Sequence, residues 1–231
     1  MRNVFVLAWV LLGLLCVAFP SYRPSGLVNF VPTKKNIVFL TFDDGPLPVY
    51  TEQTLAILAS ENVKATFHLI GNNMVKYPDL VERIRLAGHD VGNHSFNHIR
   101  LDNLIGKNLD FEIEETSKVI QDILGGKPRF FRPPGGRFNS MILEVVHRNN
   151  LIPIGWAVNT SDFLESNQKK LTAEQVEQKV VEVVGTLRGT LHPGSIILMH
   201  TGNLVTLKAL PLAIRLIKES GFQIGKLSDA L

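Results

Sequence analysis

The chain has 231 residues, of which 45% are hydrophobic and 19% charged, and its formal net charge is +3. This composition is that of a globular protein with one domain of ordinary size, and it excludes an intrinsically disordered chain. The positive charge is small and dispersed along the sequence, so it gives no reason to expect nucleic acid as a partner.

The first 22 residues contain a long apolar stretch that follows Arg2. Its core, residues 4–19, has the length of the hydrophobic part of a signal peptide and is slightly short for a membrane span. The chain's one cysteine, Cys16, lies there, so the remainder cannot form an internal disulfide. We predict a hydrophobic helix over residues 1–22, serving as signal peptide or membrane anchor, an extracytoplasmic location, and a proline-containing linker over residues 23–35.

Residues 36–231 alternate between short apolar runs and segments in which apolar residues recur with helical spacing. The apolar runs predict strands at Ile37–Phe42, Ala65–Ile70, Asp90–Asn93, Arg129–Arg132, Leu151–Val158, Ser195–Met199 and Phe222–Leu227. The helical spacing predicts helices at Thr51–Ser60, Leu80–Leu86, Phe111–Leu124, Met141–Arg148, Thr172–Leu187 and Leu204–Ser220. Thr172 and Gln175 form a capping box at the start of one of these helices. Strands that alternate with helices predict parallel βαβ units, in either a barrel or a doubly wound sheet.

Side chains able to act as acid, base or ligand follow the predicted strands. They are Asp43 and Asp44 after the first strand, His94 and His98 after the third, Arg132 at the end of the fourth, Asp162 after the fifth and His200 after the sixth. In α/β folds the carboxyl ends of parallel strands converge on one crevice or rim, where active sites lie. The positions of these residues therefore predict an active site at that end of the sheet.

Taken singly, each of these residues also has a plain structural explanation. Asp43 and Asp44 stand before Gly-Pro in a sequence typical of a turn. His200 could be a core histidine, Arg132 could pair with a surface carboxylate, and Asp162 could cap a loop. The spacing favours function only when all of them are considered together.

His94 and His98 are the strongest pair taken alone. Residues four apart lie on one face of a helical turn, so both imidazoles could reach a single cation. A His-x-x-x-His pair is also common on protein surfaces without any ligand, and the spacing alone does not separate the two explanations.

The motifs Thr41-Phe42-Asp43-Asp44-Gly45-Pro46, His94-Ser95-x-x-His98, Arg132-Pro133-Pro134-x-Gly136 and Leu198-Met199-His200 resemble those of the polysaccharide deacetylase family. This family includes chitin, chitooligosaccharide and peptidoglycan deacetylases and some acetylxylan esterases, and its catalytic domain is often called NodB-like. The resemblance covers residues 36–231. It implies an α/β fold, a distorted, incompletely closed (β/α) barrel of about seven parallel strands.

The resemblance also implies a metal site. Asp44, His94 and His98 match the family's metal ligands. Two histidines and one carboxylate suit Zn²⁺ with an open position for water, and sites of this type also take Co²⁺, Ni²⁺ or Mn²⁺.

The remaining motif residues match the family's catalytic and substrate-contacting groups. Asp43 is implied as the general base and His200 as the general acid. Arg132 would keep Asp43 ionised, and Asp162 would orient His200. The residues implied at the acetyl group are Gly135, through its backbone N–H, and Leu198 and Trp156, which would line the pocket for the acetyl methyl.

The resemblance implies removal of N-acetyl groups from an N-acetylated polysaccharide or oligosaccharide, chitin-like or peptidoglycan-like. Three positions depart from the family: Gly135 stands where an aromatic residue is usual, Asn159 where aspartate is frequent, and Phe163 where tryptophan is usual. These departures keep alternatives open. One is an esterase acting on O-acetylated polysaccharide; others are a catalytically impaired, membrane-tethered sugar-binding protein and an anchored assembly subunit.

Overall fold

A computed structural model describes residues 26–163 and 171–231. The predicted signal peptide or anchor, residues 1–22, lies outside these ranges and stays a prediction. Within the described ranges, no helix is long and apolar enough to cross a membrane.

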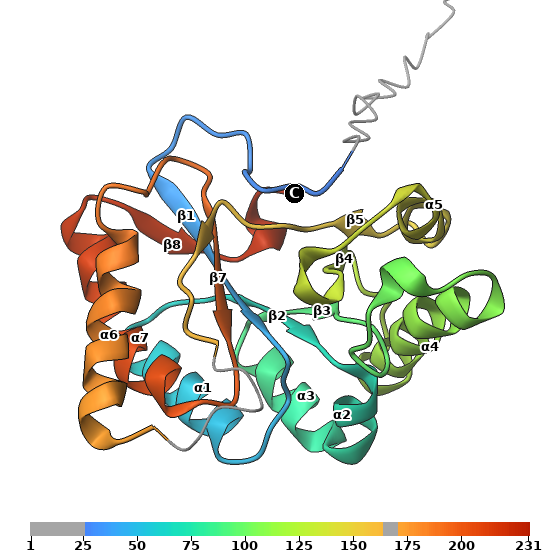
Figure 1. Cartoon of the computed structure of the whole chain (residues 1–231), viewed down its shortest axis with the longest axis horizontal. Helices are drawn as coiled ribbons and strands as arrows, with labels where there is room; N and C mark the ends of the chain where they lie inside the picture. Colours follow the sequence, from blue (N-terminus) through green and yellow to red (C-terminus); the bar gives the residue numbers. More distant parts are fainter. Residues whose placement is uncertain (1–25, 164–170) are drawn as a thin grey trace, which may run out of the picture.

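Eight parallel strands form one sheet that curls into an open barrel (Figure 1). The strands are β1 (Ile37–Asp43), β2 (Thr66–Leu69), β3 (Asp90–Asn93), β4 (Phe130–Phe131), β5 (Ile152–Pro153), β6 (Val158–Asn159), β7 (Ile196–His200) and β8 (Gln223–Gly225). Seven of them follow the order β5-β4-β3-β2-β1-β7-β6, and β8 pairs with the first part of β1. The strand β1 is therefore central, paired with β2, β7 and β8.

Helices cover the outside of the barrel. They are α1 (Tyr50–Ser60), α2 (Gly71–Lys76), α3 (Pro78–Leu86), α4 (Lys107–Leu124), α5 (Ser140–Arg148), α6 (Ala173–Leu187) and α7 (Leu204–Glu219), with short 3-10 turns at Leu101–Asn103, Pro134–Gly136 and Leu227–Asp229. Figure 1 shows α6 and α7 on one side, α4 and α5 on the other, and α1 to α3 between them. The predicted capping box of Thr172 and Gln175 is confirmed at the start of α6.

Alternation along β1 separates the outer core from the barrel interior. Leu40 and Phe42 belong to the main hydrophobic core beneath the helices. Phe39 points the other way, into a smaller apolar cluster at the amino-terminal end of the barrel interior. Thr41 and Asp43 follow on the same inner face and are buried. The interior thus changes from apolar to polar toward the carboxyl ends of the strands.

The barrel stays open between β5 and β6, the two ends of the strand order, and we call this opening the seam. A segment that precedes β1 crosses it. Val28 bridges to Ile154 and Phe30 bridges to Ser195. Val28 and Val31 are buried in the smaller apolar cluster. Residues 28–31 belong to the region predicted as a linker from its prolines. They therefore pack against the barrel and span the seam.

The predicted α/β barrel is confirmed, with two local differences. The strand predicted at Leu151–Val158 is interrupted over residues 154–157, leaving β5 and β6. Backbone hydrogen bonds change partner there, from Phe131 of β4 to Ile196 of β7, because the chain crosses the seam. The short helix α2 was not predicted, since six residues are too few to show a helical period.

Candidate active site

The polar side chains predicted at the strand ends gather around one cavity of about 490 Å³. Eight of the ten predicted site residues line it, and the other two, Arg132 and Asp162, are buried behind it. The lining residues are Asp43, Asp44, His94, His98, Gly135, Trp156, Asn159, Ser161, Phe163, Lys179, Leu198 and His200. Convergence at the carboxyl ends of the strands is therefore observed.

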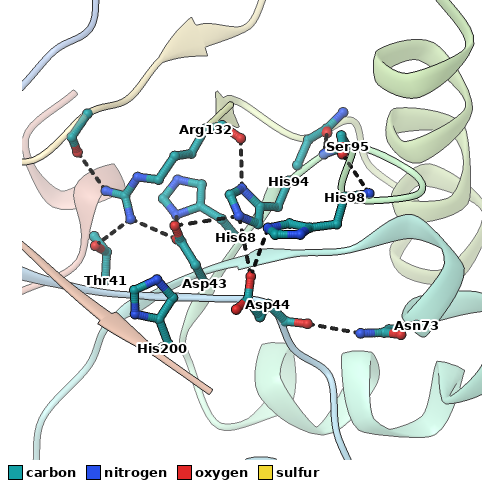
Figure 2. Close-up of polar contacts among 12 residues, drawn as sticks. Thr41, Asp43, Asp44, His68, Asn73, His94, Ser95, His98, Arg132 and His200 are labelled. Atoms are coloured by element: carbon teal, nitrogen blue, oxygen red, sulfur yellow. Dashed lines mark hydrogen bonds and ion pairs between the residues drawn. The ribbon is translucent and has the colours of Figure 1, made fainter. Parts of the chain in front are cut away.

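Asp44, His94 and His98 bring three ligand atoms within 4.8 Å of one another. Oδ1 of Asp44 lies 3.5 Å from Nε2 of His94 and 3.2 Å from Nε2 of His98 (Figure 2). Two ligands bound at about 2.0–2.1 Å to a tetrahedral zinc ion stand roughly 3.3–3.4 Å apart. The spacing of these three residues, which we call the triad, therefore fits a single ion.

Hydrogen bonds and charges around the triad also suit a cation. Nδ1 of His94 lies 2.7 Å from the carbonyl oxygen of Arg132, which can only accept, so in the neutral imidazole Nε2 keeps a lone pair facing Asp44. Oδ1 of Asp44 is buried and has no hydrogen-bond partner among the residues that the structure describes. Burial raises the pKa of Asp44, but the two histidines outweigh it and hold that pKa well below its ordinary value. Burial lowers the pKa of His94, but the carboxylates of Asp43 and Asp44 outweigh it and raise that pKa.

The helical turn expected for the two histidines is wrong. Residues 94–98 form an irregular loop after β3, in which Ser95 and His98 have positive φ angles of 64° and 54°. Positive φ is uncommon outside glycine, so this loop has a specific shape. That shape, and not a helical period, brings the His94 and His98 rings to a centroid separation of 5.0 Å.

Glu112 of α4 supports the loop from a buried position. Its carboxylate accepts hydrogen bonds from the backbone N–H groups of Phe96 and Asn97 at 2.9 and 2.8 Å, and from Nδ2 of Asn97 at 2.8 Å. In a similar way, Nδ2 of Asn73 donates to the backbone carbonyl oxygen of Asp44 at 2.9 Å. Neither support was predicted from the sequence. A glutamate within an amphipathic helix, such as Glu112, is usually a surface residue.

Asp43 and Arg132 form a buried ion pair beside the triad. Nη1 of Arg132 donates to Oδ1 of Asp43 and to Oγ1 of Thr41, both at 2.8 Å, and Nη2 donates to the carbonyl oxygen of Gly155 at 2.7 Å. Burial raises the pKa of Asp43, but Arg132 and the nearby histidines hold that pKa well below its ordinary value. Asp43 is therefore ionised, and its Oδ2 lies 3.6 Å from Nε2 of His94.

His200, the last residue of β7, lines the same cavity. Its Nδ1 lies 2.9 Å from Oδ1 of Asp162, and its backbone N–H donates to Oδ2 of that carboxylate at 2.8 Å. The hydroxyls of Thr160 and Thr206 lie 3.0 and 2.5 Å from the Asp162 oxygens. Burial lowers the pKa of His200, but Asp162, together with Asp43 and Asp44, outweighs burial and raises that pKa. The protonated imidazole is therefore favoured, with Nε2 left free of Asp162.

The rim of the cavity is open around Gly135. This residue has a left-handed backbone conformation, with φ 63° and ψ 13°. Apart from its own chain neighbours, no atom of residues 26–163 and 171–231 lies within 4 Å of where its Cβ would stand. Trp156 and Leu198 line the cavity as the sequence predicted, and the exposed ring of Phe163 lies 5.0 Å from the ring of His200. Glycine therefore suits the left-handed backbone at position 135, and the missing side chain leaves space at the rim.

The chain is similar in sequence to known polysaccharide deacetylases. The family model described as polysaccharide deacetylase matches residues 30–154. A chitooligosaccharide deacetylase from Azorhizobium caulinodans is 34% identical over 173 residues, which are 74% of this chain and 77% of that protein. Across further curated relatives the aligned region covers between 42% and 95% of their length.

Solved structures of similar proteins include both a deacetylase and a pseudoenzyme. A peptidoglycan N-acetylglucosamine deacetylase, in complex with an N-hydroxybenzamide derivative, has a TM-score of 0.78 and 30% identity, covering 88% of this chain and 91% of that one. A family 4 carbohydrate esterase pseudoenzyme from Bacillus anthracis has a TM-score of 0.77 and 26% identity, covering 89% and 68%.

Proposed function

This chain belongs to the polysaccharide deacetylase family and is a polysaccharide deacetylase, and we propose that it removes N-acetyl groups from a chitin-like or peptidoglycan-like polymer or oligomer in a metal-dependent reaction. The observation that carries this proposal is the triad of Asp44, His94 and His98 beside the buried Asp43–Arg132 ion pair. Relatives named for chitooligosaccharide and for peptidoglycan N-acetylglucosamine support an N-acetylated sugar as substrate.

The triad would hold one divalent cation. Two imidazoles and a carboxylate suit Zn²⁺ best, and the same donor set accepts Co²⁺, Ni²⁺ or Mn²⁺. When bound, such an ion supplies positive charge that increases the acidity of a water molecule and polarises the acetyl carbonyl oxygen. The partnerless Oδ1 of Asp44 and the lone pair on Nε2 of His94 are the features of the chain that support this assignment.

Asp43 would act as the general base. Its carboxylate is ionised, held by Arg132, and placed with Oδ2 toward the triad. As water adds to the acetyl carbonyl carbon, Asp43 takes the proton that the water loses. A positioned general base typically contributes ~10²–10⁴-fold to the rate.

His200 would act as the general acid. Asp162 binds its Nδ1 and favours the protonated ring, so Nε2 can deliver a proton to the departing nitrogen. The C–N bond then breaks, and acetate and a free amine are released. The negative oxygen that develops during the addition would accept a hydrogen bond from the backbone N–H of Gly135, and Trp156 and Leu198 would contact the acetyl methyl.

Acetate release from three substrates tests this function. The purified domain would be stripped of metal, reloaded with Zn²⁺ or left bare, and incubated with chitooligosaccharides, peptidoglycan and acetylxylan. We expect metal-dependent acetate release from the N-acetylated substrates, and none from a His94→Ala, His98→Ala double variant. Release from acetylxylan alone would indicate an O-acetyl esterase, because an ester leaving group depends less on protonation by His200.

A catalytically impaired sugar-binding protein is the second candidate, and the open rim at Gly135 is the observation that favours it. The similarity to a pseudoenzyme adds weight to it. Against it, the chain keeps the triad and both proposed proton-transfer residues. Binding of chitooligosaccharide without acetate release, in protein shown to contain metal, would favour this candidate.

We also propose that the enzyme works outside the cytoplasm. Its proposed substrate is an exported polymer, and the apolar stretch over residues 4–19 supports export, with the segment cleaved or retained as a membrane anchor. Cell fractionation of the full-length protein tests this, and a soluble cytoplasmic protein would contradict it.

A further inference from the structure

His68 of β2 is a fully buried ionisable side chain that the proposed reaction does not use. The sheet register pairs it with Asp43, and paired residues on parallel strands point to the same face. Nδ1 of His68 lies 3.4 Å from Oδ1 of Asp43 (Figure 2). The imidazole therefore lies beside the proposed general base, inside the barrel.

Among residues 26–163 and 171–231, neither ring nitrogen of His68 has a hydrogen-bond partner of normal geometry. A separation of 3.4 Å is long for an N–H···O bond. Contacts of this kind are often long in an unliganded enzyme and shorten in the substrate complex. Burial lowers the pKa of His68 to about 4, so the ring is neutral near pH 7 and has one N–H to donate.

Packing holds the ring in one orientation. A Cβ on Gly92 of β3 would lie 2.8 Å from Cδ2 of His68, so the missing side chain makes room for the imidazole. Cδ2 and Nδ1 lie on opposite edges of the ring. One edge therefore rests on Gly92 while the edge that carries Nδ1 faces Asp43.

We propose that His68 is a positioning residue for the base: it donates from Nδ1 to Oδ1 of Asp43 and, with Arg132, leaves Oδ2 as the oxygen that receives the proton. This inference rests on the proposed function, in which Asp43 is the base. Oδ1 already accepts from Nη1 of Arg132 at 2.8 Å, and Oδ2 lies on the side of His94 and the triad. Two donors on one oxygen oppose rotation of the carboxylate and keep the other oxygen aimed at the water.

A role as core filler is the competing explanation. Phenylalanine would fill a similar volume without burying two polar nitrogens, which is costly when they lack partners. His68 therefore suits its position better as a donor to Asp43 than as a filler.

Three substitutions separate the two roles. Asparagine places its amide nitrogen close to the position of Nδ1, glutamine places it close to that of Nε2, and phenylalanine removes both. We expect His68→Phe to lower kcat on chitooligosaccharide roughly three- to tenfold, the value of one hydrogen bond, with KM and metal stoichiometry unchanged. His68→Asn should restore most of kcat, and His68→Gln should not.

His89→Phe is the matched control. His89 is also buried, and its Nδ1 accepts from the backbone N–H of Ala65, away from the cavity. The His89→Phe variant should have a lower melting temperature and an unchanged kcat. A His68→Phe variant with the same behaviour, or equal rescue by asparagine and glutamine, would overturn the proposal.

The tautomer of His68 gives a readout independent of activity. Nitrogen-15 NMR of the wild-type imidazole should show the proton on Nδ1, and a proton on Nε2 overturns the inference even if every substitution unfolds the protein. Wild-type protein that contains metal but releases no acetate from any substrate would refute the proposed function instead. In that case the NMR result still decides whether His68 donates to Asp43.

Discussion

Replacing Asp43 by asparagine should lower both the rate of acetate release and the thermal stability, while the metal content stays close to wild type. Nη1 of the fully buried Arg132 lies 2.8 Å from Oδ1 of Asp43, so the neutral amide leaves a buried guanidinium without its counter-ion. Breaking a buried ion pair in this way costs ~3–5 kcal/mol, and we expect the lower end because asparagine keeps an acceptor oxygen. For a domain of this size the melting temperature should fall by roughly 6–12 °C.

The pH dependence of this loss follows from the pKa of Asp43. Its folded pKa is below the unfolded value, so its stabilising contribution is complete above the unfolded pKa of ~3.9 and disappears as the pH falls through the folded one. The difference in melting temperature between wild type and Asp43→Asn, measured by calorimetry on metal-free protein, should be constant near neutral pH. It should shrink only below about pH 4.

Acetate release by Asp43→Asn should fall by ~10²–10⁴-fold, with metal content close to wild type. Asp44→Asn is the matched control, because Asp44 lines the same cavity but is not the partner of Arg132 in the ion pair. It should lose metal and cost the metal-free protein less stability. If Asp43→Asn lost the metal and Asp44→Asn kept it, the two roles would be reversed. An unchanged melting temperature in Asp43→Asn would refute the energetic reasoning.

Three further changes test supporting residues. Glu112→Ala removes the acceptor that shapes the loop carrying His98, so metal affinity should weaken roughly 10–100-fold in chelator competition; unchanged affinity would show that the loop holds without it. Asp162→Asn removes the charge that raises the pKa of His200, so the alkaline limb of kcat/KM on an amide substrate should move to lower pH. An unmoved limb would argue against His200 as the acid. Gly135→Ala should lower the melting temperature by roughly 2–8 °C, because left-handed backbone costs other residues ~1–2 kcal/mol; calorimetry showing no change would mean the loop relaxes.

The grouping of the site residues at one end of the barrel could be predicted, because a position at the end of a parallel strand already implies a place in space. Asp43, His94, Arg132 and His200 come from four strands or strand ends, and the structure brings them to one end of the barrel. The prediction of a helical turn was wrong because an irregular loop, with Ser95 and His98 in left-handed conformation, also brings two residues four positions apart close together.

Supporting residues could not be predicted, because their partners are distant in sequence. His68 stands in an apolar strand where it resembles any core residue, and only the register of β1 against β2 places it beside Asp43. Glu112 shows its role only once α4 packs beside the loop after β3. The segment across the seam lies in a region whose prolines are typical of a linker, and its burial follows from the gap between β5 and β6.

The central place of β1 has a consequence for the order in which the proposed metal ligands and the proposed acid are synthesised. Asp44, His94 and His98 all lie within the first hundred residues, whereas the edge of β1 that pairs with β7 stays without its partner until His200 has been made. Ribosomes add ~5–20 residues per second, so the roughly 100 residues between His98 and His200 take about 5–20 s. A nascent chain therefore carries all three proposed metal ligands before it carries the proposed acid, and the proposed reaction must wait for the later half of the chain.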